Sequence, residues 1–244
     1  MEKMIRKKKD VRSHDDFYLK DKKYQNNPKY TTKVIYRMLK RKNFKSLIDI
    51  GCGNGDFLKY ISKRFIGKKY IGTDIHKSLI KQNKKKHKNI KFYYDNINLA
   101  KSQLKADIVH ATGVINIFDK VEKFLKNIIL RCNSKGQIFI IHYFNDYDLD
   151  YLVRYRNNKF SKTNLIEEQG WNVFSKSTIS RILNQNKKVK KFRFIEIKFP
   201  KNINVKKNKQ DLCRSWSVNF KNCKYFINGL GFLNKIYLLK IELK

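Results

Sequence analysis

Three alternate glycines mark the part of this sequence whose residue types and spacing are best suited to binding a ligand. Residues 47–57 read Leu-Ile-Asp-Ile-Gly-Cys-Gly-Asn-Gly-Asp-Phe, so β-prone residues lead into Gly51, Gly53 and Gly55 and a helical pattern follows at once. A strand that turns tightly into a helix over glycine leaves backbone N–H and C=O groups open at the carboxyl end of the strand. The segment therefore predicts a site for a nucleotide-like cofactor.

The residues around these glycines limit which cofactor can bind. The pyrophosphate fingerprint G-x-G-x-x-G requires a glycine where this chain has Asp56, whose charge would repel a pyrophosphate at the helix N-terminus. A Walker loop requires a Lys-Ser or Lys-Thr pair, and neither follows the glycines. What remains is a ligand with an adenosine end, no phosphate and preferably a positive charge. S-adenosylmethionine, with its cationic sulfonium, fits that description.

With this spacing, Leu47 to Gly55 resemble motif I of the class I S-adenosylmethionine-dependent methyltransferases. The resemblance implies a Rossmann-like sheet that holds the cofactor at the end of its first strand. The residues that it implies around the methionine end of the cofactor are Asp49, Gly51, Cys52, Gly53 and Gly55.

Acidic residues also end the next two predicted strands. Asp74 ends the strand 69–74 and is followed by Ile75; it lies 23 residues beyond Gly51, close to the spacing of a carboxylate that accepts both ribose hydroxyls. A helix cap is the alternative role for this carboxylate. In the family an acid after the third strand accepts from the adenine amino group. The resemblance therefore assigns adenine to Asp95 and Asn96, after the strand 90–94.

Two more strands, 106–111 and 134–141, continue the alternation of strands and helices, which predicts a parallel sheet covered on both faces. The entry to the first of them resembles motif IV of the family, and Thr112 at its end is expected over the methionine end of the cofactor. The predicted fold class is α/β, a Rossmann-like methyltransferase sheet that is mostly parallel, with an antiparallel C-terminal strand and helices on both faces. An extra C-terminal β-hairpin pairs 215–220 with 225–227 across 221–224, and a closing strand spans 236–243.

The chain is predicted to divide into three parts. Residues 1–27 form a mobile basic arm, residues 28–145 the S-adenosylmethionine-binding half, and residues 146–244 a substrate-side insertion, hairpin and closing strands of the same domain. The aromatic pattern of this last part resembles bacterial methyltransferases found with surface-polysaccharide and glycolipid biosynthesis. Its aromatic side chains suit stacking on a sugar ring, although they could equally pack the added strands against the sheet.

Methyl transfer from a sulfonium is an in-line displacement that needs alignment and a dry pocket, and a hydroxyl acceptor gains from a general base. The candidate bases near the strand ends are His142, Asp146 and His110. Base methylation of nucleic acids is disfavoured, because the chain has neither an Asn/Asp-Pro-Pro-aromatic motif after the fourth strand nor a Pro-Cys nucleophile. The predicted acceptor is therefore a small molecule or a glycan, most simply methylated at oxygen.

Composition alone is a weak guide to the partner. The net charge of +37 predicts weak, salt-sensitive attraction to polyanions, and it keeps an RNA methyltransferase (ribose or guanine N-methylation) as an alternative. However, Lys outnumbers Arg 46 to 11, the basic runs are scattered, and the residue usage is typical of an AT-rich bacterial genome. A catalytically inactive, cofactor-binding partner subunit is the second alternative.

Cysteine spacing predicts neither a metal site nor a disulfide framework. The N-terminal residues lack the apolar core of a signal peptide, and no apolar run is long enough to cross a membrane. These features favour a cytoplasmic protein without a transmembrane segment. The oligomeric state is left open by the sequence.

Overall fold

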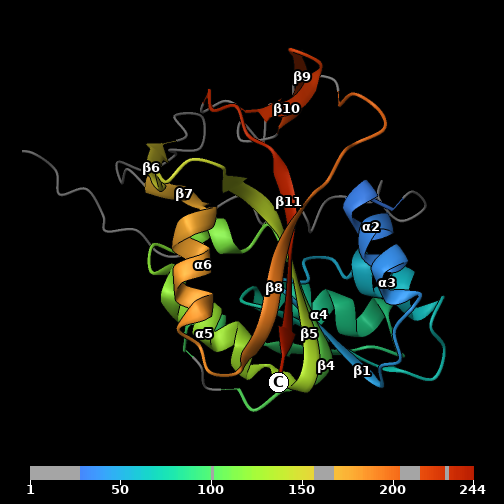
Figure 1. The fold of residues 1–244 in the computed structure, drawn as a ribbon. Helices are drawn as coiled ribbons and strands as arrows, with labels where there is room; N and C mark the ends of the chain where they lie inside the picture. The colour runs from blue at the N-terminus through green and yellow to red at the C-terminus, as the bar shows by residue number, and fades with distance from the viewer. Residues whose placement is uncertain (1–27, 100–101, 157–167, 204–214, 229–230) are drawn as a thin grey trace, which may run out of the picture.

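A central β-sheet lies between two layers of helices in the computed structural model of the chain (Figure 1). The structure describes residues 28–99, 102–156, 168–203, 215–228 and 231–244. The arm predicted for residues 1–27 lies outside these described residues. In Figure 1 the sheet is seen close to edge-on, with α5 and α6 on one side and α2 and α3 on the other.

The main sheet has the strand order β3-β2-β1-β4-β5-β11-β8. Strands β3, β2, β1, β4 and β5 are parallel, and β11 is antiparallel to both of its neighbours, β5 and β8. This arrangement confirms the predicted Rossmann-like α/β class with an antiparallel C-terminal strand. The strands are β1 (Ser46–Ile50), β2 (Lys69–Asp74), β3 (Lys91–Tyr94), β4 (Ala106–Thr112), β5 (Cys132–Asn145), β8 (Val189–Glu196) and β11 (Ile236–Leu243).

Each face of the sheet has its own hydrophobic core because the strands are apolar on both faces, as expected for a parallel sheet covered by helices. Ile48, Val109 and Ile140 pack toward α5 and α6, whereas Leu47 and Ile108 pack toward α2, α3 and α4. Successive strand residues therefore alternate between the two layers. The helices are α2 (Tyr30–Leu39), α3 (Asp56–Ser62), α4 (Lys77–Lys86), α5 (Val121–Leu130) and α6 (Lys176–Asn184).

The connection between β3 and β4 departs from the regular alternation of strands and helices. Its described residues contain only the short 3₁₀ helix η2 (Ile97–Leu99), which packs against α5. A second 3₁₀ helix, η3 (Ile115–Ile117), follows β4. The chain therefore passes from the end of β3 to the start of β4 along α5, and this path places Asp95 near that helix.

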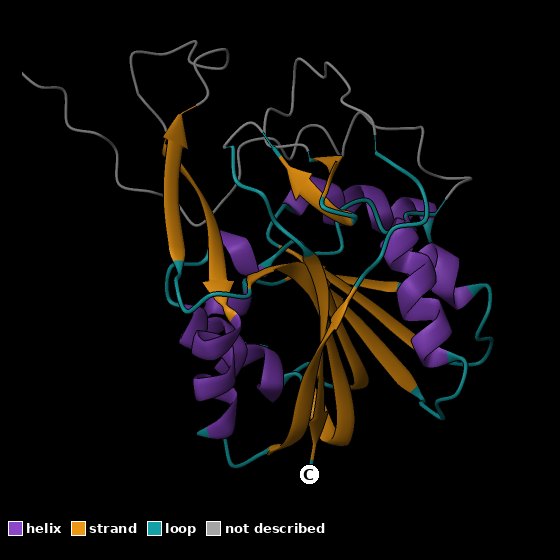
Figure 2. Cartoon of the chain, turned by 45° about the horizontal axis from the view of Figure 1, so that its top comes forward, coloured by secondary structure: helices purple, strands orange, loops and turns teal. Residues whose placement is uncertain are grey.

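Two β-hairpins stand beyond the carboxyl edge of the parallel strands (Figures 1 and 2). Strands β6 (Tyr151–Arg156) and β7 (Glu168–Ser175) are antiparallel, and β7 joins the end of β5. Strands β9 (Trp216–Phe220) and β10 (Cys223–Ile227) form the predicted C-terminal hairpin as a separate two-stranded sheet. The predicted connection 221–224 is wrong in length. Only Lys221 and Asn222 form the turn, both with positive φ (45° and 60°), because this conformation matches the twist of the strands.

Candidate active site at the carboxyl edge of the sheet

The turn between β1 and α3 is a tight loop in which Gly51, Gly53 and Gly55 all have positive φ (69°, 52° and 80°). The N–H groups of Gly51 and Cys52 both donate to the carbonyl oxygen of Thr73, at 2.8 and 2.9 Å, which fastens the turn to the end of β2. Residues with a Cβ adopt this left-handed region only with strain. The alternate glycines are thus a backbone requirement of the turn.

Space as well as conformation requires glycine at the first of these positions. A Cβ on Gly51 would lie 2.6 Å from the Cγ2 of Val114, which follows β4. By contrast, Gly67 has a similar φ of 77° but nothing within 4 Å of an added Cβ. The chain after β4 therefore closes directly over the glycine turn.

Helix α4 holds the other side of the turn through two side chains that the sequence reasoning did not identify. The side-chain amide of Asn83 donates to the carbonyl oxygen of Gly53 at 2.7 Å. Nε2 of His87 lies 3.3 Å from the backbone carbonyl oxygen of Asn54. Burial lowers the pKa of His87. Both residues lie in the lysine run 81–88, and together with Ile80, just before this run, they share a helical face at spacings of three and four. That spacing was the available signal.

Asp74 links the glycine turn to the second strand. Its Oδ2 accepts from the N–H of Gly53 at 2.9 Å and its Oδ1 from the N–H of His76 at 3.0 Å. The N-cap residue of α4 is His76, so Asp74 precedes the cap of that helix. The carboxylate lies where the sequence predicted it, at the carboxyl end of β2 beside the turn, with Ile75 directly after it. Its role toward a ribose stays a prediction.

Two buried carboxylates give this part of the edge a negative character. The side chain of Asp49 is buried in β1, and Asp74 is 8% exposed. Burial raises the pKa of the Cys52 thiol well above its usual value, and the charges of Asp49 and Asp74 raise it further. A thiol at this position therefore stays neutral, and a cation is favoured beside it.

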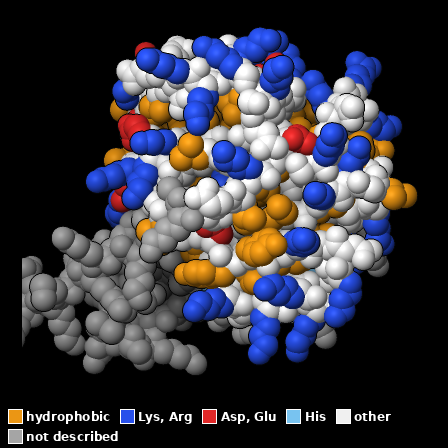
Figure 3. Space-filling model, turned by 90° about the horizontal axis from the view of Figure 1, so that it is seen from below, with side chains coloured by type: hydrophobic (Ala, Val, Ile, Leu, Met, Phe, Trp, Pro, Cys, Tyr) orange, Lys and Arg blue, Asp and Glu red, His pale blue; other side chains and the backbone are white. Residues whose placement is uncertain are grey.

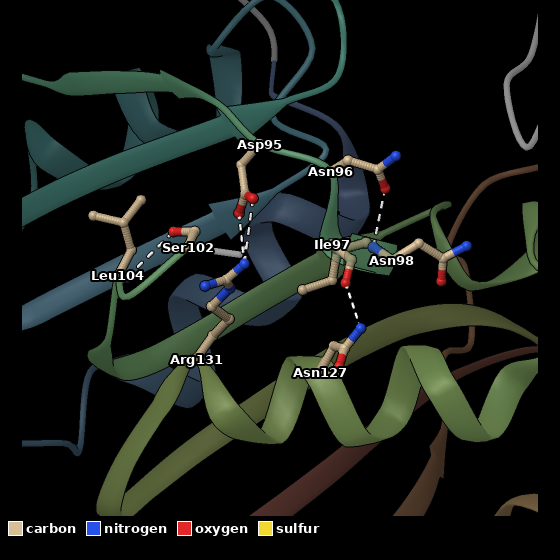
Figure 4. A network of polar contacts seen from close by, with 8 residues as sticks. All are labelled: Asp95, Asn96, Ile97, Asn98, Ser102, Leu104, Asn127 and Arg131. Atoms are coloured by element: carbon tan, nitrogen blue, oxygen red, sulfur yellow. Dashed lines mark hydrogen bonds and ion pairs between the residues drawn. The ribbon is translucent and has the colours of Figure 1, made fainter. Parts of the chain in front are cut away.

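Asp95 meets a partner that the sequence did not indicate (Figure 4). Both carboxylate oxygens accept from Nη2 of Arg131, at 3.2 and 3.0 Å, and both side chains are buried. Burial raises the pKa of Asp95, and the positive charge of Arg131 opposes this shift. Asn96 lies nearby with its Oδ1 accepting from the N–H of Asn98 at 3.0 Å. The carboxylate predicted to contact adenine is thus also one half of a buried ion pair.

Side chains from β1 and β4 form a short polar chain on the face that carries α3. Nδ1 of His110 lies 2.7 Å from Oδ1 of Asp49, and Nε2 of His110 lies 2.8 Å from Oγ1 of Thr112. The ring of Phe57, from the first turn of α3, stacks on the imidazole with 3.9 Å between centroids. The structure therefore brings together three residues that the sequence placed in separate roles.

The other two candidate bases lie at the end of β5. Asp146 accepts from the hydroxyl of Tyr237 at 2.7 and 2.8 Å and pairs with Lys176 at the start of α6. Burial raises the pKa of Asp146, but the hydrogen bonds and charge of these partners outweigh it and lower the pKa overall. His142 is buried, and its ring packs at 6.1 Å from that of Trp171. Strand alternation puts His142 on the face of Ile140 and Phe144, opposite to the face of His110.

Comparison with known proteins agrees with this fold and site. A family model described as a methyltransferase domain matches residues 23–186. A protein of Invertebrate iridescent virus 6, 235L, which its name assigns provisionally to the methyltransferases, is 35% identical over 89 residues. That match covers 33% of this chain and 34% of the relative, so the chain spans about a third of the relative's length.

Solved structures resemble the chain in fold over almost its whole length. The PH0226 protein of Pyrococcus horikoshii OT3 has a TM-score of 0.57 and 14% identity, with 94% of this chain and 99% of that one covered. The N-methyltransferase NodS of Bradyrhizobium japonicum WM9, in complex with S-adenosyl-L-homocysteine, has a TM-score of 0.54 and 10% identity, with 94% and 96% covered.

The family model spans more than half of the sequence, so the chain belongs to the methyltransferase-domain family. The family that the glycine turn predicted is therefore confirmed. Within the described ranges, no helix combines the length and apolar character that crossing a membrane requires.

Proposed function

We propose that this chain is an S-adenosylmethionine-dependent methyltransferase that methylates an oxygen atom of a small-molecule or glycan-type acceptor. The observation that carries the proposal is the glycine turn closed on Asp74, with a second buried carboxylate, Asp49, behind it. Open backbone groups suit an adenosine ligand, and two carboxylates beside a neutral thiol favour a cationic donor over a phosphate.

The residue roles follow from position at the carboxyl edge. The methionine end of the donor would lie on the turn from Gly51 to Gly55, the ribose at Asp74 and the adenine near Asp95 and Asn96. Because Arg131 already binds the carboxylate of Asp95, an adenine amino group would have to share that carboxylate. His142, Asp146 and His110 are the candidate bases.

The acceptor side is proposed from the two hairpins. Tyr151 of β6 stacks on Phe232 with 5.1 Å between ring centroids and 15° between planes, and both residues are half-buried. Partly exposed aromatic rings next to a polar edge suit the flat face of a sugar or another ring. We assign this surface to the acceptor, in keeping with the resemblance to enzymes of surface-polysaccharide and glycolipid biosynthesis. We also propose that the protein acts in the cytoplasm.

Calorimetry with S-adenosylmethionine and S-adenosylhomocysteine tests the donor site. Asp74→Ala is expected to weaken both affinities by about 10- to 100-fold, since a charged hydrogen bond contributes about 1.5–3 kcal/mol. Asp148→Ala, which removes an exposed carboxylate in the loop after β5, is the matched control and is expected to bind like the parent. Absence of binding by the parent protein would refute the enzymatic proposal. Equal affinity of Asp74→Ala would refute only the ribose assignment.

Methylation of RNA is the second candidate because the net charge is +37. On the face seen from below, however, Lys and Arg side chains are spread around the surface with hydrophobic side chains between them (Figure 3). Charge dispersed in this way attracts a polyanion only weakly on that face. Formation of S-adenosylhomocysteine should be compared for sugar hydroxyls, phenols, amines and RNA. Turnover confined to RNA, with a steep dependence on salt, would favour this alternative.

A further inference from the structure

The parallel register of β1 and β4 places Asp49 directly beside His110. Thr112 follows two residues later on the same face of β4. These two facts produce the polar chain from the carboxylate through the imidazole to a hydroxyl, with distances of 2.7 and 2.8 Å. The arrangement follows from strand pairing and does not depend on a flexible loop.

The direction of the hydrogen bonds follows from the chemistry of the groups. A carboxylate only accepts, so Nδ1 of His110 carries the proton that Asp49 accepts. In a neutral imidazole Nε2 is then bare, and it accepts from the hydroxyl of Thr112. The oxygen of Thr112 is left with lone pairs for another donor.

The two inner members of the chain are shielded from water and held in place. Asp49 is 3% exposed and His110 is 4% exposed, and the stacked ring of Phe57 covers one face of the imidazole. Thr112 is only partly buried and ends β4. The hydrogen-bonded side chains thus lead from the buried Asp49 to Thr112 at the edge of the sheet.

That end of β4 adjoins the proposed donor site. Ala111 is paired with Ile50, so Thr112 lies at the level of Gly51 across the two strands. Val114, two residues further, lies against Gly51. The hydroxyl at the end of the polar chain is therefore next to the turn that would hold the methionine end of the donor.

We infer that Thr112 is a catalytic residue that takes the acceptor's proton and passes its own to His110, and that Asp49 and His110 are positioning residues acting through it. This inference rests on the proposed methyl transfer. As the acceptor oxygen forms its bond to the methyl carbon, the carbon–sulfur bond breaks and its electron pair stays on sulfur. The acceptor's proton moves to Oγ1 of Thr112 while the proton of Thr112 moves to Nε2 of His110. Asp49 stabilises the imidazolium, which later releases the proton to water.

The hydrogen bonds from Asp49 through His110 to Thr112 explain why His110 is preferred as the base over the other two candidates, His142 and Asp146. Asp146 is a poor base, since Lys176 and Tyr237 hold its carboxylate and lower its pKa. His142 lies on the opposite face of the sheet, among aromatic rings.

Kinetics on four variants test the inference with the acceptor from the panel above that the parent methylates fastest. Thr112→Val, which keeps the shape without the hydroxyl, should lower kcat by about 100-fold and leave the S-adenosylmethionine Kd within about threefold. Thr112→Ser should recover most of the rate. His110→Gln, which can still donate to Asp49 but cannot take up the proton, should match Thr112→Val. The control is Thr178→Val, which removes a similar hydroxyl bond, to Asp150 at 2.9 Å, and should keep the parental kcat.

A measurement that needs no acceptor decides the matter independently. In ¹⁵N spectra of the full chain, His110 should have a protonated Nδ1 and a bare Nε2, and Nε2 should shift more with S-adenosylmethionine than with S-adenosylhomocysteine. Side chains remote from the sulfonium would respond equally to both ligands. Equal responses, or an unchanged kcat in Thr112→Val, would overturn the inference while leaving the proposed function intact. A parent protein that binds neither ligand would instead overturn the proposed function itself.

Discussion

The half of the chain that we propose binds the methyl donor (residues 28–145, the donor half) and the half that we propose binds the acceptor (residues 146–244, the acceptor half) are built in different ways. In the donor half, the bonds that hold the glycine turn end on its backbone groups: Gly51 and Cys52 donate to the carbonyl oxygen of Thr73, and the side chains of Asp74 and Asn83 both bind the backbone of Gly53. In the acceptor half, side chains far apart in the sequence hold the structure, such as Asp146 with Tyr237, 91 residues away. The proposed donor site therefore depends on the backbone conformation of the turn and on the side chains that bind that backbone, whereas the proposed acceptor surface depends on contacts between side chains.

The largest expected effect tests a buried ion pair of the donor half. Arg131→Met leaves the carboxylate of Asp95 buried without its partner, and this should lower the free energy of unfolding by about 3–5 kcal/mol. Denaturant unfolding measures the change. Asp95→Asn combined with Arg131→Met should recover part of the loss, because no buried charge is then left unpaired.

An ion pair of the acceptor half provides the comparison. Lys191, which is 66% exposed, lies 3.4 Å from Glu242, and Lys240 also binds that carboxylate. Lys191→Met should cost less than about 1 kcal/mol. A loss as large as that of Arg131→Met would contradict the contrast between a buried and an exposed pair.

The next effect concerns the backbone of the donor half. Gly51→Ala should lower the free energy of unfolding by about 2–3 kcal/mol and weaken S-adenosylmethionine binding at least tenfold, because strain at positive φ adds to the clash with Val114. Gly67→Ala has the same backbone strain in open space and should cost about 1 kcal/mol. Equal costs for the two variants would show that the contact with Val114 has no role.

A smaller effect is expected in the acceptor half. Tyr237→Phe removes the hydroxyl that donates a hydrogen bond to Asp146. Because Lys176 still binds this carboxylate, the free energy of unfolding should fall by only about 1 kcal/mol. The S-adenosylmethionine Kd should not change. Tyr225→Phe, which keeps the ring beside Lys235, is the control for both measurements. Weaker donor binding in Tyr237→Phe would show that the two halves are coupled.

The smallest effect is a difference in pH dependence. The pKa of Asp146 is lowered in the folded state, so its contribution to stability is present above the unfolded-state value of about 3.9 and is lost as the pH falls. The pKa of Asp95 is raised, so its contribution is present below that value and is lost as the pH rises.

Unfolding measured from about pH 2.5 to 7 therefore separates the two halves. The free energy of unfolding should fall less steeply with acid in Asp146→Asn than in the parent, and more steeply in Asp95→Asn. The Asp146 effect should stay under about 1 kcal/mol, because its side chain is 43% exposed. The same slope in both variants would contradict the assigned directions.

Much of the fold could be predicted because its signals are local. The strands of the parallel sheet and the closing strand were recognised from apolar runs and their spacing, and the C-terminal hairpin was placed with only its turn length wrong. The short η2 in place of a longer helix, in the described residues between β3 and β4, could not be foreseen, since the path along α5 depends on packing such as the bond from Asn127 to the carbonyl oxygen of Ile97 (Figure 4).

The candidate site, like the fold, has some residues that the sequence predicts and others that it does not. Spacing predicts Asp74 at the end of its strand, but it gives no indication that Asn83 and His87 hold the glycine turn from the side of α4. Nor could it show that Arg131 would bind Asp95, 36 residues away. Such contacts require the relative placement of two elements, which a local pattern does not contain.

The sequence by itself determined the glycine turn, because positive φ at three alternate positions permits few residues other than glycine and restricts the backbone to one tight path. With the acids at the strand ends, that turn was enough to indicate the methyl donor. Only the tertiary structure decided which side chains meet at the turn. The register of β1 against β4 joins Asp49 to His110, and that register is fixed by the packing of both faces of the sheet rather than by either strand alone.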